Sequence, residues 1–318
     1  MEALDVISLV VYGATILLGL PSNALALYIF YCQAKTRLTP NLIYMINLCV
    51  SDLVFVLFLP LKMLELGKME RPMPSFLCPL YNLIHFGTIY TSTCFLTVVG
   101  VGRYLAAAYP IHYQVYKKAC YSCLISLGIW CLVGSHGLLI FALETSRDVN
   151  STLFAGKDTS CFSNFSEDQL ALLAPVRLEL SVVLFFLPLA ITSFCYVGCI
   201  RVLVGSHLHK RKKRRAVRVA VATHMVFILC FGPYNISHVV CFIKRENIWW
   251  RNVAVIPSAC SAFLDPLIFY FLSSAMDDGI TQVWLSLRQK YSSIRQGLGK
   301  ITLAHGKARS QQPPSGVA

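Results

Sequence analysis

The chain has 318 residues and a net charge of +13, and 56% of its residues are hydrophobic while only 14% are charged. A soluble globular domain carries about 25% charged residues, so this sequence lacks the polar surface that water requires. This composition excludes a soluble multidomain enzyme. The 13 cysteines and 18 glycines are scattered through long apolar runs, which excludes a disulfide scaffold and a collagen-like chain. We therefore predict an integral membrane protein.

A helix that crosses a membrane needs about 20 mostly apolar residues, because every backbone polar group must be satisfied within the segment. The stretches that meet this requirement predict an all-α membrane protein, a seven-transmembrane helix bundle with spans at 5–31, 41–64, 76–103, 121–143, 176–204, 216–243 and 250–273. We expect kinks at the prolines inside these spans, namely Pro21, Pro60, Pro188, Pro233, Pro257 and Pro266.

Lysine and arginine are concentrated after the first, third and fifth spans and in the C-terminal tail, with the densest run at 210–215. The positive-inside rule then places the N-terminus outside and the C-terminus in the cytoplasm, as in a multi-pass plasma membrane protein. The positive net charge indicates a cytoplasmic face that meets anionic lipid, and no nucleic-acid partner is predicted.

Two cysteines fall on the oxidising side of this topology, Cys78 at the start of the third span and Cys161 in the long outer loop. We predict that they form a disulfide. Asn150 and Asn164 begin N-x-S/T sequons in the same loop and are predicted glycosylation sites.

After the seventh span, apolar residues at helical spacing in 277–291 predict a short amphipathic helix on the inner membrane surface. We predict a seven-transmembrane domain at 1–291 that includes this helix. A disordered cytoplasmic tail is predicted at 292–318.

No nucleophile elbow, zinc-protease or phosphate-loop motif occurs, so we expect no enzyme, no metal centre and no cofactor. Polar residues inside the spans are costly and are therefore candidates for function. Asp52, with Asn47 beside it, is expected to lie close to Asn23 and Asp265. This group is either an interhelical hydrogen-bond cluster or a sodium or proton site that controls a conformational equilibrium.

A second polar group is predicted near the outer ends of the spans. Arg177 and Arg251 stand on different helices, and a guanidinium presents a planar fork that binds a carboxylate through two hydrogen bonds. Each arginine alone is also compatible with an interfacial anchor. Taken together, the candidates for a site that binds an anion with an apolar body are Arg177, Arg251, His238, Tyr90, His136 and Tyr234.

The chain resembles the rhodopsin-like (class A) G-protein-coupled receptors over residues 5–291. The resemblance rests on Asn23, N-L-x-x-S-D at 47–52, G-R-Y at 102–104, Trp130, Pro188 with Tyr196, F-G-P-Y at 231–234 and D-P-L-I-F-Y at 265–270, together with the pair Cys78 and Cys161. It implies roles in activation and coupling for Arg103, Tyr104, Asp265 and Tyr270. Gly102 stands where most members carry an acid, which removes the counter-ion beside Arg103.

Within that class the chain is similar to the free fatty acid receptors. TRLTP (36–40), GRYLAAAYP (102–110) and LFFLPLAITSFCYVGC (184–199) resemble the medium- and long-chain type. PVRLEL (175–180), CFSNFSEDQL (161–170) and WWRNVAV (249–255) resemble the short-chain types. The resemblance implies that Arg177 and Arg251 bind a fatty carboxylate, with the other four candidates around it. Short-chain ligands are slightly favoured over medium- or long-chain ones.

We therefore expect a receptor for free fatty acids that signals to heterotrimeric G proteins and binds arrestin. A carboxylate transporter is the alternative of another class, but such carriers usually contain internal repeats, and the two halves of this chain share no repeated pattern. A receptor for a nucleotide or peptide is a third possibility. The two tryptophans beside Arg251 argue against it.

Overall fold

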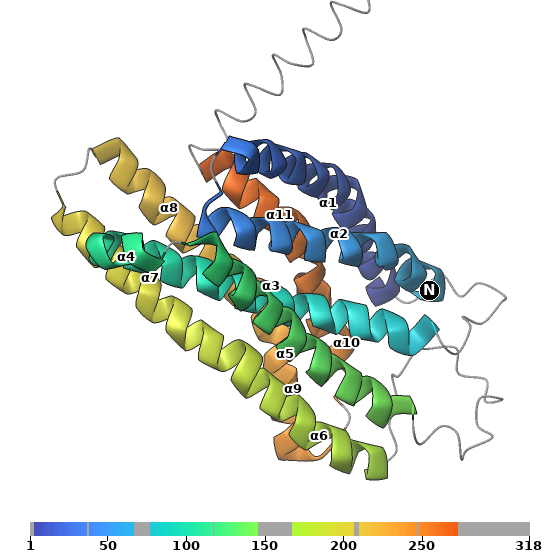
Figure 1. The fold of residues 1–318 in the computed structure, drawn as a ribbon. Coiled ribbons are helices and arrows are strands. Elements are labelled where there is room, and N and C mark those ends of the chain that lie inside the picture. The colour runs from blue at the N-terminus through green and yellow to red at the C-terminus, as the bar shows by residue number, and fades with distance from the viewer. Residues whose placement is uncertain are drawn as a thin grey trace, which may run out of the picture. The chain divides into compact units, whose positions relative to one another are not determined.

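A computed structural model describes residues 3–36, 38–66, 77–116, 118–145, 167–206, 210–246 and 248–272. The described secondary structure in these ranges is helical and contains no strand. The elements, coloured along the chain in Figure 1, are α1 Ala3–Thr36, α2 Pro40–Leu66, α3 Leu77–Ala108, α4 Pro110–Tyr116, α5 Ala119–Thr145, α6 Glu167–Ser181, η3 Val182–Phe186, α7 Leu187–Gly205, α8 Lys210–Val226, η4 Phe227–Phe231, α9 Gly232–Lys244, α10 Arg251–Ala254 and α11 Ile256–Leu272.

Six helical segments in the described ranges are long and apolar enough to cross a membrane. They are Ala3–Thr36, Pro40–Leu66, Leu80–Ala108, Ala119–Leu143, Leu170–Gly205 and Lys213–Lys244. The seventh predicted span is interrupted at Val255, between α10 and the 17-residue helix α11. The seven-helix expectation and the helical structure thus agree.

Two of the predicted kinks coincide with single wide turns of π-helix. The segment η3 ends two residues before Pro188, and η4 ends two residues before Pro233. A proline ring collides with the carbonyl of the residue four positions earlier, which here is Leu184 or Leu229 inside the wide turn. Widening the helix at those residues relieves the collision.

The other prolines behave differently. Pro257 follows the interruption at Val255, whereas Pro21, Pro60 and Pro266 lie inside continuous helices.

Several helices extend beyond the predicted spans at their basic ends. α1 continues to Thr36, and α8 begins at Lys210, so the basic run 210–215 is helical rather than a loop. The run belongs to a helix because lysine and arginine are good helix formers once outside the hydrocarbon. The chain between the third and fourth spans contains the short helix α4.

The first, second and last helices pack through small residues, which allow backbones to approach closely where no hydrophobic effect drives association. A methyl group on Gly19 of α1 would lie 3.2 Å from Val56 of α2 and 3.5 Å from the carbonyl oxygen of Ala262 in α11. Asn23 of α1 donates a hydrogen bond from its side-chain amide to that same carbonyl. This junction fixes α1 against α11.

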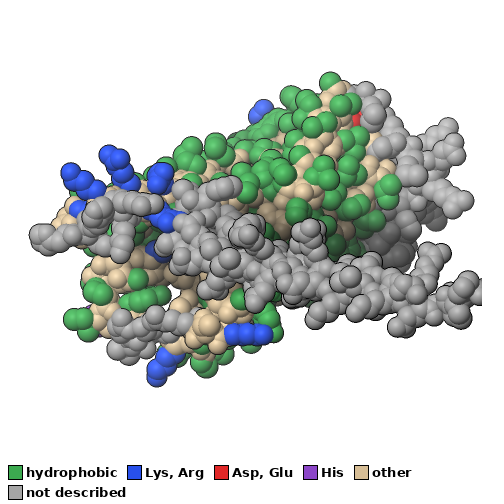
Figure 2. Space-filling model, turned by 90° about the horizontal axis from the view of Figure 1, so that it is seen from above, with side chains coloured by type: hydrophobic (Ala, Val, Ile, Leu, Met, Phe, Trp, Pro, Cys, Tyr) green, Lys and Arg blue, Asp and Glu red, His purple; other side chains and the backbone are tan. Residues whose placement is uncertain are grey.

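The main core lies between α3, the π segments and the helices around them. Phe95 of α3, Phe185 of η3 and Phe227 and Phe231 of η4 are fully or almost fully buried in it. Many large apolar side chains remain exposed instead, including Leu17, Leu57 and Phe194. Figure 2 shows hydrophobic side chains over most of the visible described surface, with most lysines and arginines toward one end, as expected for a lipid-facing belt.

Several predicted features lie outside the described residues. Cys161, Asn150 and Asn164 fall within 146–166, and the side chain of Cys78, in the first turn of α3, is also outside the description. The predicted disulfide and glycosylation sites therefore stay predictions. The surface helix at 277–291 and the tail at 292–318, with the domain boundary between them, fall in the same category.

Candidate functional site

Five of the six predicted ligand-binding residues line one narrow cavity between α3, α5, α6, η3 and α9. Its volume is about 30 Å³, and we call it the apolar cavity. Those five residues are Tyr90, His136, Arg177, Tyr234 and His238. The rest of its wall is Asn82, Leu83, Phe86, Gly87, Val133, Gly137, Ile140, Phe141, Leu180 and Leu184. The wall combines many hydrocarbon groups with a few polar ones, as small-molecule sites usually do.

The sixth predicted residue, Arg251, lines a larger neighbouring cavity of about 420 Å³, which we call the polar cavity. It lies between the N-terminal parts of α1 and α3, the C-terminal end of α2, and α10, and its wall includes Asp5, Lys62 and Glu65. The two cavities share four wall residues, Asn82, Phe86, Arg177 and Tyr234. Arg177 therefore stands at their junction and borders both.

The two arginines converge on one histidine. Arg177 is 7% exposed on α6, and Arg251 is the first residue of α10. Both guanidinium groups interact electrostatically with His238 of α9, whose ring is 2% exposed. An anion at the junction of the cavities would therefore lie within the field of both guanidinium groups, and the burial of Arg177 and His238 would strengthen the attraction.

Aromatic rings form the wall where the two cavities meet. Phe86 of α3 stacks on Tyr234 of α9, with ring centroids 5.1 Å apart and planes within 5°. His238 meets the same Tyr234 ring edge-on at 4.4 Å. Phe86 also stacks against His85, with ring centroids 5.5 Å apart. These contacts hold the Tyr234 and His238 rings in fixed orientations beside Arg177.

The hydroxyl of Tyr90 is held by a residue that the sequence did not single out for this site. Asn235 accepts hydrogen bonds at its side-chain oxygen from Tyr90 at 3.5 Å and from Ser181 at 3.0 Å. Its own amide donates to the Phe231 carbonyl at 2.8 Å. Residues 235–237 match the N-x-S/T pattern of a glycosylation site, but the Asn235 side chain is fully buried and cannot carry a glycan. Its position inside a span is the useful signal.

His136 faces an acid across the cavity rim. Its Nε2 lies 3.5 Å from the Glu179 carboxylate on α6, and its Nδ1 lies 2.8 Å from the Leu132 carbonyl oxygen. Glu179 was not predicted. It stands two residues after Arg177, and residues two apart project from different sides of a helix, so spacing gave no hint. A ligand carboxylate near His136 would meet this second anion.

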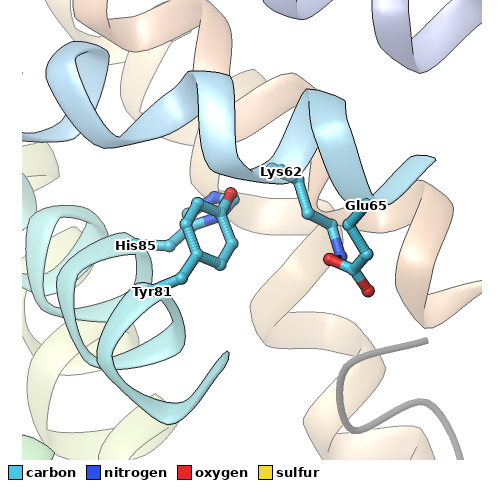
Figure 3. A network of polar contacts seen from close by, with 4 residues as sticks. All are labelled: Lys62, Glu65, Tyr81 and His85. Atoms are coloured by element: carbon cyan, nitrogen blue, oxygen red, sulfur yellow. Dashed lines mark hydrogen bonds and ion pairs between the residues drawn. The ribbon is translucent and has the colours of Figure 1, made fainter. Parts of the chain in front are cut away.

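A polar network crosses the wall of the polar cavity between α2 and α3 (Figure 3). Lys62 and Glu65 form an ion pair at 2.8 Å, with side chains 21% and 5% exposed. The Tyr81 hydroxyl lies 2.6 Å from His85 Nδ1. His85 Nε2 lies 3.3 Å from the Ser258 hydroxyl of α11. None of these residues was predicted, although charges at 62 and 65 at the end of a span are the kind of signal that identifies such sites.

Comparisons with known proteins match this architecture. The model of the family "7 transmembrane receptor (rhodopsin family)" matches residues 22–269. The chain is 39% identical to free fatty acid receptor 3 of Mus musculus over 96% of this chain and 95% of that protein. It is 40% identical to free fatty acid receptor 1 of Macaca fascicularis over 84% of this chain and 91% of that protein. It is also 40% identical to G-protein coupled receptor 42 of Homo sapiens, over 83% of this chain and 76% of that protein.

The chain belongs to the free fatty acid receptor family. It is thus a multi-pass membrane receptor and not an enzyme, and the carboxylate transporter interpretation is set aside. Free fatty acid receptors 3 and 1 match this receptor at nearly the same identity, so overall identity does not assign it to one subtype.

The receptor buries two carboxyl groups in the middle of the bundle. Asp52 of α2 is 0% exposed and Asp265 of α11 is 1% exposed, and the two interact electrostatically. Within the described ranges, neither carboxylate has a hydrogen-bond partner, nor does the side-chain oxygen of Asn23. Asn47, expected beside Asp52, turns to α5 instead, where its oxygen accepts a hydrogen bond from the Trp130 indole at 2.9 Å.

At the opposite end of the receptor, α3 and α7 are in close contact. A methyl group on Gly198 of α7 would lie 2.6 Å from the ring of Tyr104, so that ring packs directly against Gly198. Arg103 interacts electrostatically with Tyr196 of the same helix. A methyl group on Gly102 would lie 2.8 Å from the Asn41 side-chain oxygen of α2, so a larger residue at this position requires the Asn41 side chain to move. The side chain of Tyr270 is outside the described residues.

Proposed function

We propose that this receptor is activated by short-chain fatty acids, which bind as carboxylates at the junction of the two cavities. A fatty acid is ionised at neutral pH, since carboxyl groups titrate near pH 4. The observation that carries the proposal is the position of Arg177, which borders both cavities, while Arg251 lines one of them and both act on His238. In this arrangement the carboxylate bridges the guanidinium groups, and Tyr234 and His238 surround it.

The acyl tail is proposed to enter the apolar cavity, beside Tyr90 and His136. A volume of about 30 Å³ supports a short tail. The tight wall between α3 and α5 also supports a short tail. Leu83 packs so closely on Gly137 that a methyl group added to Gly137 would lie 2.5 Å from the Leu83 side chain. A medium- or long-chain acid remains the alternative ligand, and it would need this wall to open.

Activation follows if the bridge between Arg177 and Arg251 is stronger in the active arrangement than in the resting one. We propose that the bridge draws the outer ends of α6 and α10 together, with the N-terminus outside. The bundle then opens on the cytoplasmic side around Arg103 and Tyr104 to admit the C-terminal helix of a heterotrimeric G protein, and later arrestin. Bound G protein must raise the affinity of the receptor for the fatty acid by the same factor by which the bound acid raises its affinity for the G protein.

The first prediction concerns ligand length. In cells that express the full chain, calcium and cyclic AMP responses to carboxylates from two to eighteen carbons should be strongest for acids of two to six carbons. Each acid should be tested on mock-transfected cells as the control. Potency that increases toward sixteen or eighteen carbons would support the long-chain alternative. The absence of a calcium or cyclic AMP response to every acid would overturn the proposed ligand.

We also propose that Asp52, Asp265 and Asn23 hold a sodium ion. Four buried carboxylate oxygens and one amide oxygen, which lack hydrogen-bond partners in the described residues, fit a hard cation better than an interhelical hydrogen-bond cluster. The ion would supply the positive charge that two neighbouring buried carboxylates require.

Sodium should stabilise the folded receptor. A ligand at ten times its dissociation constant stabilises the folded state by about 1.4 kcal/mol. The Tm of the detergent-solubilised receptor should therefore rise by a few degrees when sodium chloride replaces choline chloride at equal ionic strength. Asp52→Asn should abolish the difference. A native receptor with equal Tm in both salts would reject the ion.

A further inference from the structure

Two cysteines that take no part in the site lie at the beginning of α5. Cys120 and Cys123 are both exposed and neither is bonded to another sulfur. They are three residues apart in the first turns of a helix that begins at Ala119, so they lie on neighbouring positions of one helix side. Both thiols are accessible from outside the bundle.

The residues around these thiols are of the kinds typical of an inner membrane interface. Lys118 precedes them and is exposed, and Tyr121 between them is 48% exposed. Basic residues mark the cytoplasmic loops, and tyrosine is enriched at the interface. One and two turns further along, Leu124 and Leu127 are 58% and 59% exposed, which is the lipid-facing side of α5.

We propose that Cys120 and Cys123 are S-acylated with long-chain fatty acyl groups. Each cysteine thiol gives up its proton, and the resulting thiolate attacks the carbonyl carbon of an acyl-coenzyme A. The bond from that carbon to the coenzyme A sulfur breaks, and the released coenzyme A thiolate takes up one proton in place of the one that the cysteine lost. The products are one cysteine thioester and free coenzyme A, so no oxidant or reductant is required. Cysteines beside a membrane surface are typical sites of this reversible modification.

The attached chains would extend into the inner leaflet along the exposed leucines of α5. They would anchor the beginning of this helix, next to α4 and the end of α3. Residues 261–318 contain no cysteine, so these sulfurs offer an anchor that the segment after the seventh span does not. The proposal rests on the orientation proposed above and is independent of the fatty acid ligand.

The chain contains a matched control in Cys131. This cysteine is also exposed and lies on α5, eleven residues beyond Cys120. Eleven residues are three turns, so it projects from nearly the same side, roughly 16 Å farther along the helix. That position is inside the hydrocarbon, where the coenzyme A headgroup does not reach.

The test is an acyl-exchange assay on the full chain expressed in mammalian cells. Free thiols are blocked with N-ethylmaleimide, thioesters are cleaved with neutral hydroxylamine, and the new thiols are tagged with a polyethylene glycol maleimide. We expect a hydroxylamine-dependent band shift of two steps. Cys120→Ser and Cys123→Ser should each lose one step, the double variant should lose both, and Cys131→Ser should keep both.

Two results would overturn the proposal. The first is the absence of a shift in the native chain, or a shift that persists in the double variant, while an impermeant maleimide reaches these thiols only in permeabilised cells. That combination leaves the orientation intact and removes the acylation alone. The second is reaction of Cys120 and Cys123 with the impermeant maleimide in intact cells, which overturns the orientation together with the acylation.

Discussion

Replacing Arg177 with alanine should lower the potency of propionate by a few hundred-fold or more. The proposed bridge pairs one buried carboxylate with two guanidinium groups, and Arg177 is 7% exposed at the junction of the cavities. Removing one partner of a buried ion pair costs about 3–5 kcal/mol, and each 1.4 kcal/mol is tenfold in affinity. Arg251→Ala should have a similar effect. The measurement is the calcium dose response at matched surface expression.

Three further variants show whether Arg177→Ala acts on ligand binding or on folding. Lys244→Ala removes a positive charge from the exposed end of α9, outside both cavities, and should leave potency unchanged. Arg177→Lys keeps the charge but loses the planar fork, so it should recover only part of the potency. The double variant of Arg177 and Arg251 should lose much less than the product of the single effects, since both arginines serve one carboxylate. Undiminished potency in both single variants would reject the bridge.

The seven spans were predictable because the hydrocarbon thickness alone sets their length and composition. The helix ends were not, because hydropathy reports where a chain leaves lipid and not where its hydrogen bonds end. Lys210 is helical although it lies in the most basic run of the chain. The wide turns before Pro188 and Pro233 follow from proline chemistry, yet Pro21 and Pro60 sit in unbroken helices. The local sequence does not distinguish these cases.

The site was predictable to the extent that its residues are costly to place in a membrane. Arginine, histidine and tyrosine toward the same end of several spans identified five residues that line one cavity and a sixth next to it. The pairings between helices were not predictable. Glu179 meets His136, and Asn47 meets Trp130 rather than Asp52, because the rotation of each helix about its axis decides which side chains face each other. A single sequence leaves that rotation open.

Gly87 provides the sharpest test of where the acyl tail lies. It lines the apolar cavity, and a methyl group added there would have no described atom within 4 Å, so an added side chain extends into the cavity. In Gly87→Leu we expect acetate to keep most of its potency while the potency of longer acids falls. Each methylene that no longer enters the cavity loses about 0.8 kcal/mol, roughly fourfold in potency. The hexanoate-to-acetate potency ratio should therefore fall by about tenfold or more.

Gly128→Leu is the matched control. Gly128 lies on the exposed side of α5, it too has open space beyond its Cα, and it borders neither cavity. Both substitutions replace a glycine inside a helix by leucine, so both gain helix propensity of about 0.8 kcal/mol. A change of the potency ratio in Gly87→Leu alone then reports the cavity. Equal ratios in the two variants and the native receptor would place the acyl tail elsewhere, even with the carboxylate still bound by Arg177.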